Sequence, residues 1–408
     1  MRLLQVNKFH YPRGGADKYF LFLEKSLRAA GHEVAVFSMA HPDNEASPWQ
    51  DYFVSKIDFE RGTLKDKLKT PGRVIYSLEA KKKFTRLLEA FRPDLIHCHN
   101  IYHQLSPSIL SAAKEKRIPI IMHLHDYKLI CPNYRLFINN EFCRLCLDKK
   151  SYWPCVKKNC YSGRGRSFLA ALEMGIHHRL LKIYEKNIDL LLAPSRFIAD
   201  LTREAGWPKE KIRVLMNPAP AFSPALAKEG DYLFYFGRLA AEKGVDKLLG
   251  AVKATPFKLR IAGRGPLEAG LKKEAAAEIK SGKIKFLGER RSEDLNREID
   301  GAAAVVLPSL WPENMPLALL EALARGKIII ASRTGGLPEI IRENENGFLF
   351  TPGNIQELSA KIKLLLNLPA PEKARLRAGA LAIAKRLNPE NHLRHLEKIY
   401  KELAKKSE

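Results

Sequence analysis

Glu313 and Glu321 stand eight positions apart in the segment AAVVLPSLWPENMPLALLEALARG. The segment predicts a strand, a loop that holds Glu313, and a helix from about Met315 to Arg325 with Glu321 about two turns into it. The start of a helix offers free backbone N–H groups and a positive dipole end, so a diphosphate would bind well there. The alternative is that one glutamate faces solvent and the other caps the helix.

Two cations follow another apolar run in YFGRLAAEKG. Arg238 and Lys243 could converge on one anionic group there, and Gly237 lets the backbone come close to it. Two cations beside a diphosphate would stabilise it as a leaving group. Two further apolar runs, in RIAGRGP and FLGERR, end in loops where a nucleobase could stack on the backbone, at Gly263, Arg264 and Gly288.

A glycine pair follows the first predicted strand, in FHYPRGGADKYF. Gly14 and Gly15 precede a helix expected to start near Asp17, and without side chains they would let backbone N–H groups approach a phosphate or an acceptor. A pair of glycines before a helix is also an ordinary turn.

Histidines alternate at the ends of two predicted strands, in DLIHCHN and IIMHLHDY. His97 and His99 therefore share one face of their strand, as do His123 and His125. Imidazoles titrate near neutrality and can handle an acceptor proton, although a structural role is the competing interpretation. We place His99 and Asp126 on the acceptor side, with His99 at the mouth of the site.

Five cysteines fall within 30 residues, including a Cys-x2-Cys pair: Cys131, Cys143, Cys146, Cys155 and Cys160. Thiolates at such spacing suit a tetrahedral structural zinc ion, with one thiol to spare. Free thiols or a disulfide are the alternatives.

Short apolar strands alternate with amphipathic helices throughout the 408 residues, which predicts an α/β chain with parallel sheets. The segment MNPAPAFSPALAKEG separates two such series. We therefore expect two Rossmann-like domains, at residues 1–215 with a Cys-rich insertion at 131–160 and at residues 216–388, followed by a terminal helix at 389–408. Such sheets bind ligands beyond the carboxyl ends of their strands.

The net charge of +24 predicts an anionic partner. Cations concentrate between Arg61 and Arg92, where Leu and Phe residues at helical spacing suggest an amphipathic helix on an anionic membrane surface; a solvated basic face is the alternative. The N-terminus lacks a signal-peptide pattern and no apolar run is long enough to span a bilayer, so we expect a cytoplasmic protein, peripheral on the inner face of the membrane.

The ordered motifs FGRLAAEKG, AGRGP, FLGER, Glu313 with Glu321, and IIIASRTGG resemble those of the retaining glycosyltransferase family 4. The resemblance implies a GT-B fold of two facing Rossmann-like domains, with the terminal helix crossing back to the N-terminal domain. It implies that Arg238 and Lys243 bind the donor diphosphate, which also lies against Gly14 and Gly15.

The same resemblance assigns the residues around the transferred sugar. Glu313 would contact the hydroxyls of that sugar, His125 would lie beside it, and Glu321 would hold the ribose of the donor. The backbone amides near the sugar would be those of Asn314, Met315 and Leu317. The pattern CPN, CxxC, NCYSG resembles a bacterial subgroup of the family and implies zinc ligands at Cys131, Cys143, Cys146 and Cys160.

The sequence thus predicts a retaining transfer of a hexose from a UDP- or GDP-sugar to a glycan or lipid-linked acceptor in cell-envelope polysaccharide synthesis. No catalytic cofactor is expected, and no Asp-x-Asp motif stands where it would hold a metal ion against the diphosphate. The competing predictions are an epimerase or phosphorylase of the same fold and a basic, zinc-containing protein that binds nucleic acid. No recognised nucleic-acid motif supports the last.

Overall fold

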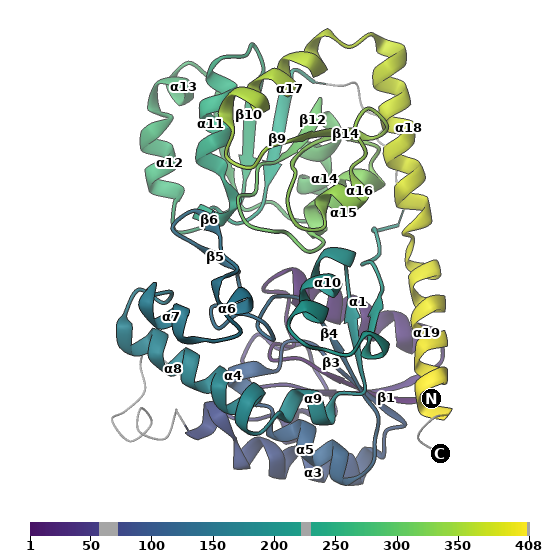
Figure 1. Ribbon diagram of the computed structural model, residues 1–408. Helices are drawn as coiled ribbons and strands as arrows, with labels where there is room; N and C mark the ends of the chain where they lie inside the picture. The colour runs from purple at the N-terminus through teal and green to yellow at the C-terminus, as the bar shows by residue number, and fades with distance from the viewer. Residues whose placement is uncertain (57–71, 222–229, 406–408) are drawn as a thin grey trace.

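The computed structural model describes residues 1–56, 72–221 and 230–405. It consists of two α/β domains, one above the other, with the last two helices running along one side of both (Figure 1). Within these residues no helix combines the length and the apolar character that crossing a membrane requires.

The N-terminal sheet has six parallel strands. Apolar residues dominate its central strands, as expected where helices cover both faces of a sheet. In spatial order the strands are β2 (Glu33–Phe37), β1 (Arg2–Val6), β3 (Leu95–Cys98), β4 (Ile120–His123), β7 (Leu190–Ala193) and β8 (Ile212–Val214).

The helices of this domain vary from single turns to four turns. They are α1 (Gly15–Ala29), α3 (Leu78–Phe91), α4 (Tyr102–Leu105), α5 (Ser108–Glu115), α6 (Leu145–Asp148), α7 (Trp153–Lys157), α8 (Arg164–Met174), α9 (Ile183–Asn187) and α10 (Arg196–Glu204). A π-helix over Gly175–Leu180 continues α8, and two short strands, β5 (Phe137–Ile138) and β6 (Glu141–Phe142), form a hairpin.

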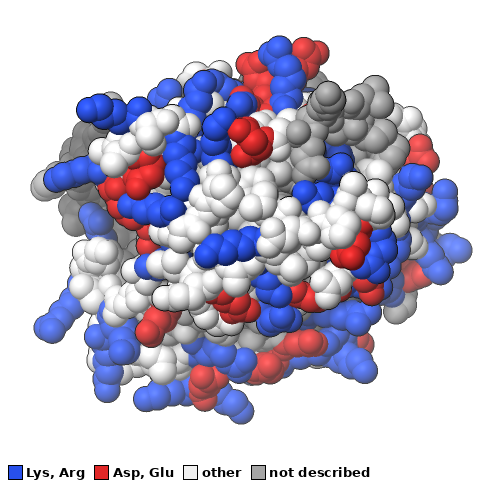
Figure 2. Space-filling view, turned by 90° about the horizontal axis from the view of Figure 1, so that it is seen from above, with Lys and Arg blue, Asp and Glu red and all other residues white. Residues whose placement is uncertain are grey.

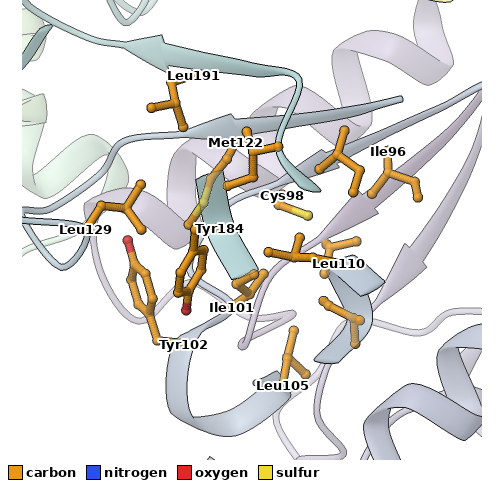
Figure 3. Close-up of a cluster of buried hydrophobic side chains, with 14 of the residues drawn as sticks. Ile96, Cys98, Ile101, Tyr102, Leu105, Leu110, Met122, Leu129, Tyr184 and Leu191 are labelled. Carbon is orange, nitrogen blue, oxygen red and sulfur yellow. The ribbon is translucent and has the colours of Figure 1, made fainter. Parts of the chain in front are cut away.

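Apolar side chains of the sheet and of the helices beneath it form the main core of this domain. Figure 3 shows Met122 and Leu191 of the sheet together with Tyr102, Leu105 and Tyr184 from the helices. Cys98 lies in this core, where burial raises the pKa of its thiol far above the ordinary value, so it behaves as a small apolar residue.

The C-terminal sheet is also parallel and six-stranded. Its strands are β11 (Ile284–Gly288), β10 (Lys258–Ala262), β9 (Tyr232–Phe236), β12 (Ala304–Leu307), β13 (Ile328–Ser332) and β14 (Gly347–Phe350). Its helices are α11 (Val245–Lys253), α12 (Glu268–Glu274), α13 (Ala276–Lys280), α14 (Ser292–Gly301), α15 (Leu317–Ala324), α16 (Leu337–Ile340), α17 (Ile355–Asn367) and α18 (Ala370–Arg386).

The last helix, α19 (Pro389–Lys405), leaves the C-terminal domain and packs on the N-terminal one (Figure 1). Leu396, Ile399 and Tyr400 are buried in a cluster with residues of β1, α1 and β3. The ring of His392 contacts the carbonyl of Met216 at 2.9 Å. The helix therefore ties the two domains together at their outer side.

The predicted alternation of strands and helices is confirmed, and each predicted apolar run is a strand. The sequence analysis missed β8, which has only three residues, and the hairpin of β5 and β6. The chain passes from β8 to β9 through the connection in which we placed the domain boundary; residues 222–229 of it lie outside the described residues.

The amphipathic helix predicted in the basic stretch is α3, but its apolar face points inward. Phe84, Leu87 and Phe91 are buried in the core, so the Leu and Phe spacing reflects packing on the sheet and not a membrane-facing surface. Lys81 pairs with Glu115 at 2.6 Å. Residues 61–71 of the stretch lie outside the described residues.

Candidate active site

In each sheet the order of the strands reverses at one point, between β1 and β3 and between β9 and β12. Ligands of open α/β sheets bind at the carboxyl ends of the strands beside such a point. The loops after β1, β3, β9 and β12 carry the glycine pair, His99, Arg238 and Glu313. The fold therefore places the predicted residues at the two switch points.

The side chain of Glu313 is held by two neighbours. Its Oε1 atom accepts hydrogen bonds from Lys243 Nζ at 2.5 Å and from Ser309 Oγ at 2.6 Å. Glu313 is only 5% exposed, whereas the side chain of Lys243 keeps 22% of its surface and lies over the ring of Trp311 at 5.2 Å. The ion pair is thus partly exposed, through Lys243.

Glycines fix the backbone around this pair. Gly244 has φ of 63°, and a Cβ there would lie 2.1 Å from the carbonyl oxygen of Pro308; at Gly335 a Cβ would lie 2.1 Å from that of Glu313. The amide of Gly336 donates to the carbonyl of Glu313 at 2.6 Å. The KG and TGG motifs therefore supply the glycines that are needed where three loops meet around Glu313.

The ends of β9, β10 and β11 are linked through backbone hydrogen bonds. Gly237 donates to Ala262, and Gly263 donates to Gly288. Gly263 has φ of 134°, and a Cβ on it would lie 1.9 Å from the carbonyl oxygen of Gly237, so only glycine fits. Arg238 and Arg264, which follow these strands, are exposed.

Helix α15 begins at Leu317, so Glu321 lies about one turn into it, not two as predicted. Burial raises the pKa of Glu321, against the opposing effect of nearby Lys18 from the N-terminal domain. Helix α1 begins at Gly15, two residues before the predicted start, and a Cβ on Gly15 would lie 3.7 Å from the side chain of Leu317. The starts of α1 and α15, one from each domain, therefore lie close together.

His125 lies beside the same loop from the other domain. Its carbonyl accepts a hydrogen bond from the side-chain amide of Asn314 at 3.3 Å, and the hydroxyl of Tyr127 donates to the carbonyl of Pro312 at 2.7 Å. His125 is half-buried. The structure thus brings His125 together with Lys243, Glu313 and Leu317.

Four histidines form a stack beneath the crevice. The rings of His97, His99, His123 and His125 have centroids 4.4 to 6.0 Å apart and planes inclined by 15° to 25°. The arrangement follows from two features. The histidines stand two residues apart along β3 and β4 and just beyond their ends, and the two strands pair in parallel.

Hydrogen bonds connect the stack to α19. His125 Nε2 lies 2.8 Å from His99 Nδ1, His99 Nε2 lies 3.0 Å from Gln5 Oε1, and Tyr400 Oη lies 2.6 Å from His97 Nδ1. Because an amide oxygen only accepts, His99 carries its proton on Nε2, its Nδ1 accepts, and His125 Nε2 donates. The tautomer of His125 is thus set by residues beneath it.

Burial keeps these rings neutral. It lowers the pKa of His97 to about 3, and burial together with the charge of Lys8 lowers that of His125 to about 3. The pKa of His99 is also well below its ordinary value, through burial and then through His97. His125 therefore offers hydrogen bonds to a ligand without adding a charge.

We had expected His99 to line the mouth of the site, but it does not. It is fully buried, with both ring nitrogens engaged by His125 and Gln5, because β3 ends behind the loop that carries His125. Asp126 is half-buried and caps the amide of Lys128 at 2.9 Å, and burial raises its pKa.

Known proteins match both halves of the chain. A family model described as Glycosyltransferase Family 4 matches residues 13–220, and one described as Glycosyl transferases group 1 matches residues 219–406. The chain belongs to glycosyltransferase family 4. This family 4 glycosyltransferase has the GT-B fold predicted from its motifs.

Similar proteins match from about half of the chain to nearly all of it. A protein of Klebsiella pneumoniae, described as an uncharacterized 42.6 kDa protein in the cps region, is 26% identical over 84% of this chain and 88% of its own length. The amylovoran biosynthesis glycosyltransferase AmsK of Erwinia amylovora is 31% identical over 47% of this chain and 50% of its own. The structure of Anabaena HepE with UDP superimposes with a TM-score of 0.69 at 19% identity, covering 99% of this chain and all of that one.

The five cysteines of the insertion line one small cavity, together with Asn133, Phe137 and Leu145. All five are free thiols. Among the described residues, no three His, Cys, Asp or Glu side chains are arranged to hold a metal ion. The spare thiol of the sequence analysis, Cys155, is buried in the same cavity and hydrogen-bonds to Cys160, which raises its pKa.

Several residues of the site were not predicted. Ser309 and Lys18 carry no motif of their own, while Gln5 lies in an apolar strand and Tyr400 in an amphipathic helix. Tyr400 follows Leu396 and Ile399 on the buried face of α19, so spacing alone assigned it to packing. Only the three-dimensional fold shows that these residues reach Glu313, Glu321 and the histidines.

Proposed function

We propose that this glycosyltransferase moves a hexose, with retention of configuration, from a UDP- or GDP-sugar to a glycan or lipid-linked acceptor in cell-envelope polysaccharide synthesis. The observation that carries the proposal is the Lys243–Glu313 pair at the start of α15, opposite His125 and Gly15. The chemistry of these groups suits a sugar diphosphate bound between the domains.

The positions of the residues support a role for each. The start of α15, Arg238 and Lys243 would bind the diphosphate and stabilise the negative charge that develops on it as the glycosidic bond breaks. Glu313 would accept hydrogen bonds from the sugar, with the amides of Asn314, Met315 and Leu317 nearby. Glu321 would accept from the ribose hydroxyls. Backbone amides at Gly14 and Gly15 would approach the phosphates from the other domain.

His125 would lie beside the transferred sugar. Because Nε2 of the neutral ring donates to His99, the other nitrogen, Nδ1, can accept a hydrogen bond from a sugar hydroxyl, while a cation there would compete with Lys243 for the phosphates. Retention would follow if the acceptor attacks the sugar on the same face that the diphosphate leaves, so no side chain would act as a nucleophile. The donor site is proposed to work without a divalent ion.

The names of similar proteins support the donor and the pathway. HepE is described in complexes with UDP and with UDP-glucose. The Klebsiella protein comes from a cps region, and AmsK is named for amylovoran biosynthesis. These names concern other proteins, and here they favour a nucleotide-sugar donor and a polysaccharide product.

Thermal unfolding in the presence of UDP, GDP, ADP and their common sugar conjugates tests the proposal. We expect one nucleotide series to raise the unfolding temperature, with EDTA leaving that shift unchanged. Slow hydrolysis of the matching sugar nucleotide would then identify the sugar. Formation of a new sugar nucleotide without acceptor would identify an epimerase instead, and no shift with any nucleotide would contradict the proposal.

We also propose a structural zinc ion in the insertion, with Cys131, Cys143, Cys146 and Cys160 as ligands. The donor set fits zinc because five thiols line one cavity, although their side chains would have to converge further. Metal analysis of protein purified without chelators should give one zinc per chain, retained in Cys155→Ser and lost in Cys146→Ser. Zinc-free protein would contradict the site, and loss in Cys155→Ser would reassign its ligands.

A further inference from the structure

The helix formed by α8 and the π-helix that follows it presents apolar side chains outward. Among the described residues, thirteen large hydrophobic side chains are exposed, and six of these lie between positions 153 and 181. They are Trp153, Phe168, Leu169, Leu172, Leu180 and Leu181. We call this set the α8 surface.

The spacing of these residues places them on one side of the helix. Phe168, Leu172 and Leu180 recur at multiples of four, and the half-buried Ile176 falls between the last two. Trp153 of α7 extends the stripe, with its ring centroid 6.5 Å from that of Phe168.

The opposite side of the same helix anchors it to the domain. Ser167, Ala171 and Met174 are buried, and His177 contacts the carbonyl of Ile75 at 2.8 Å. Because the inner face already packs on the domain, the outer apolar face has no part in the core. Exposed apolar patches of this kind mark interaction surfaces.

Cations surround the α8 surface. Between positions 149 and 186 all nine are exposed: Lys149, Lys150, Lys157, Lys158, Arg164, Arg166, Arg179, Lys182 and Lys186. Of the two acidic residues in this range, one is buried and the other half-buried. Glu173 is buried beside Lys128 at 2.9 Å, and Glu185 accepts from His178 at 2.6 Å.

The negative charge of Glu173 is balanced by neighbouring side chains inside the protein. Burial alone would raise the pKa of this carboxyl, but Lys128 and His103 outweigh that effect and lower it to about 2. The segment from 149 to 186 therefore presents nine exposed cations, against one partly exposed carboxylate, that of Glu185, in the same range. By contrast, Figure 2 shows Lys and Arg interspersed with Asp and Glu on the face of the molecule seen from above, on the side of the C-terminal domain.

We propose that the α8 surface docks the protein on a bilayer that contains anionic phospholipid. Trp153, Phe168 and the leucines would enter the boundary between head groups and acyl chains, while the surrounding Lys and Arg bind the head groups. A protein partner fits less well because protein interfaces are depleted of Lys, and a nucleic acid would leave the leucines in water. This inference does not depend on the proposed reaction.

The surface lies in the N-terminal domain, where α7 and α8 project at the lower left of Figure 1. The insertion also reaches the other domain, because Arg135, just before the hairpin of β5 and β6, lies 3.9 Å from Glu242. A bilayer on the α8 surface would therefore contact the domain that carries His125.

Co-sedimentation of the full chain with vesicles tests the proposal. We expect binding to vesicles of phosphatidylglycerol and phosphatidylcholine, and much weaker binding to phosphatidylcholine alone. Leu169→Glu/Leu172→Glu should weaken binding to the anionic vesicles about tenfold or more, because it removes apolar contact and adds repulsion. The matched control is Leu364→Glu/Leu366→Glu on α17, where two leucines of similar exposure should be replaceable without effect.

A second pair of variants separates this surface from α3. Lys157→Glu/Lys158→Glu should weaken binding severalfold, whereas Lys82→Glu/Arg86→Glu, which changes exposed cations of α3, should change it little. Circular dichroism and thermal unfolding would establish that each variant folds. The proposal is overturned if the wild type stays in solution at low salt, if the α3 variant alone loses binding, or if the leucine variant of α8 changes only self-association.

Discussion

On the C-terminal side of the crevice Lys243 and Glu313 form a partly exposed ion pair, whereas on the N-terminal side His125 and His99 share a hydrogen bond between neutral rings. The first pair is held by loops in which only glycine fits, the second by burial and by hydrogen bonds that continue to Gln5. One side thus offers charge to a ligand, and the other offers fixed hydrogen bonds without charge. A phosphate and a sugar hydroxyl need these two environments.

Removing the charge of the exposed pair should have the largest effect. Lys243→Met deletes the cation proposed to stabilise the diphosphate, so we expect kcat for sugar transfer, or for donor hydrolysis, to fall by about 100- to 1000-fold. Lys247→Met is the matched control, because Lys247 lies on α11 and pairs with Asp246 at 3.0 Å. A loss of less than threefold in Lys243→Met would show that the ion pair only supports the loop.

The neutral histidines on the N-terminal side should make the free energy of unfolding depend on pH under acidic conditions. In the unfolded chain each histidine binds a proton below about pH 6.5. In the folded protein His97 and His125 stay unprotonated down to about pH 3. The free energy of unfolding should therefore fall with decreasing pH in this window, by about 1.4 kcal/mol per pH unit for each such histidine.

Urea unfolding at a series of pH values measures this slope. His97→Gln should flatten it by about one histidine's contribution. The control is His395→Gln, which replaces an exposed histidine of α19. An unchanged slope in His97→Gln would mean that the stack is protonated in the folded protein, and the contrast between the two sides would then fail.

Between these extremes lies Glu321, a half-buried carboxyl of the C-terminal domain whose pKa is lowered by Lys18 of the N-terminal domain and raised more by burial. Glu321→Ala should weaken donor binding by about 1 to 3 kcal/mol through lost hydrogen bonds to the ribose, with kcat nearly unchanged. Calorimetric titration with the nucleotide measures this affinity. The control is Glu293→Ala, which replaces an exposed glutamate of α14. Unchanged affinity would remove Glu321 from the donor site.

The charged side of the crevice could be predicted from the sequence because its residues stand next to strand ends in short motifs. Lys243 and Glu313 are 70 positions apart, yet both follow strands that are neighbours in the sheet, so the fold class was enough to bring them together. The buried side could not be predicted in the same way. The alternation of His97 and His99 gave their common face, but not that the chain would cover His99 completely.

The helices α3 and α8 show a second limit of sequence patterns. Both combine apolar residues with cations, and the sequence analysis chose the denser basic stretch that includes α3. Periodicity establishes that a helix has an apolar face but not which way that face points. In α3 Phe84 and Leu87 face the core, while in α8 Leu169 and Leu172 face solvent.

The smallest expected effect tests whether α19 positions His125 from a distance. Tyr400→Phe removes the hydroxyl that lies 2.6 Å from His97 and 3.5 Å from Gln5, the residue that orients His99. Loss of this hydrogen bond should lower the free energy of unfolding by about 1 kcal/mol. If Gln5 then turns, the tautomer of His125 is no longer fixed, so kcat should fall a few-fold while KM for the donor is unchanged. Tyr161→Phe, which removes a hydrogen bond to Pro132 at 2.8 Å in the insertion, should cost similar stability and leave kcat intact. Equal kcat in the two variants would show that the link through Tyr400 only stabilises the fold, whereas a selective loss would make the last helix part of the neutral side of the site.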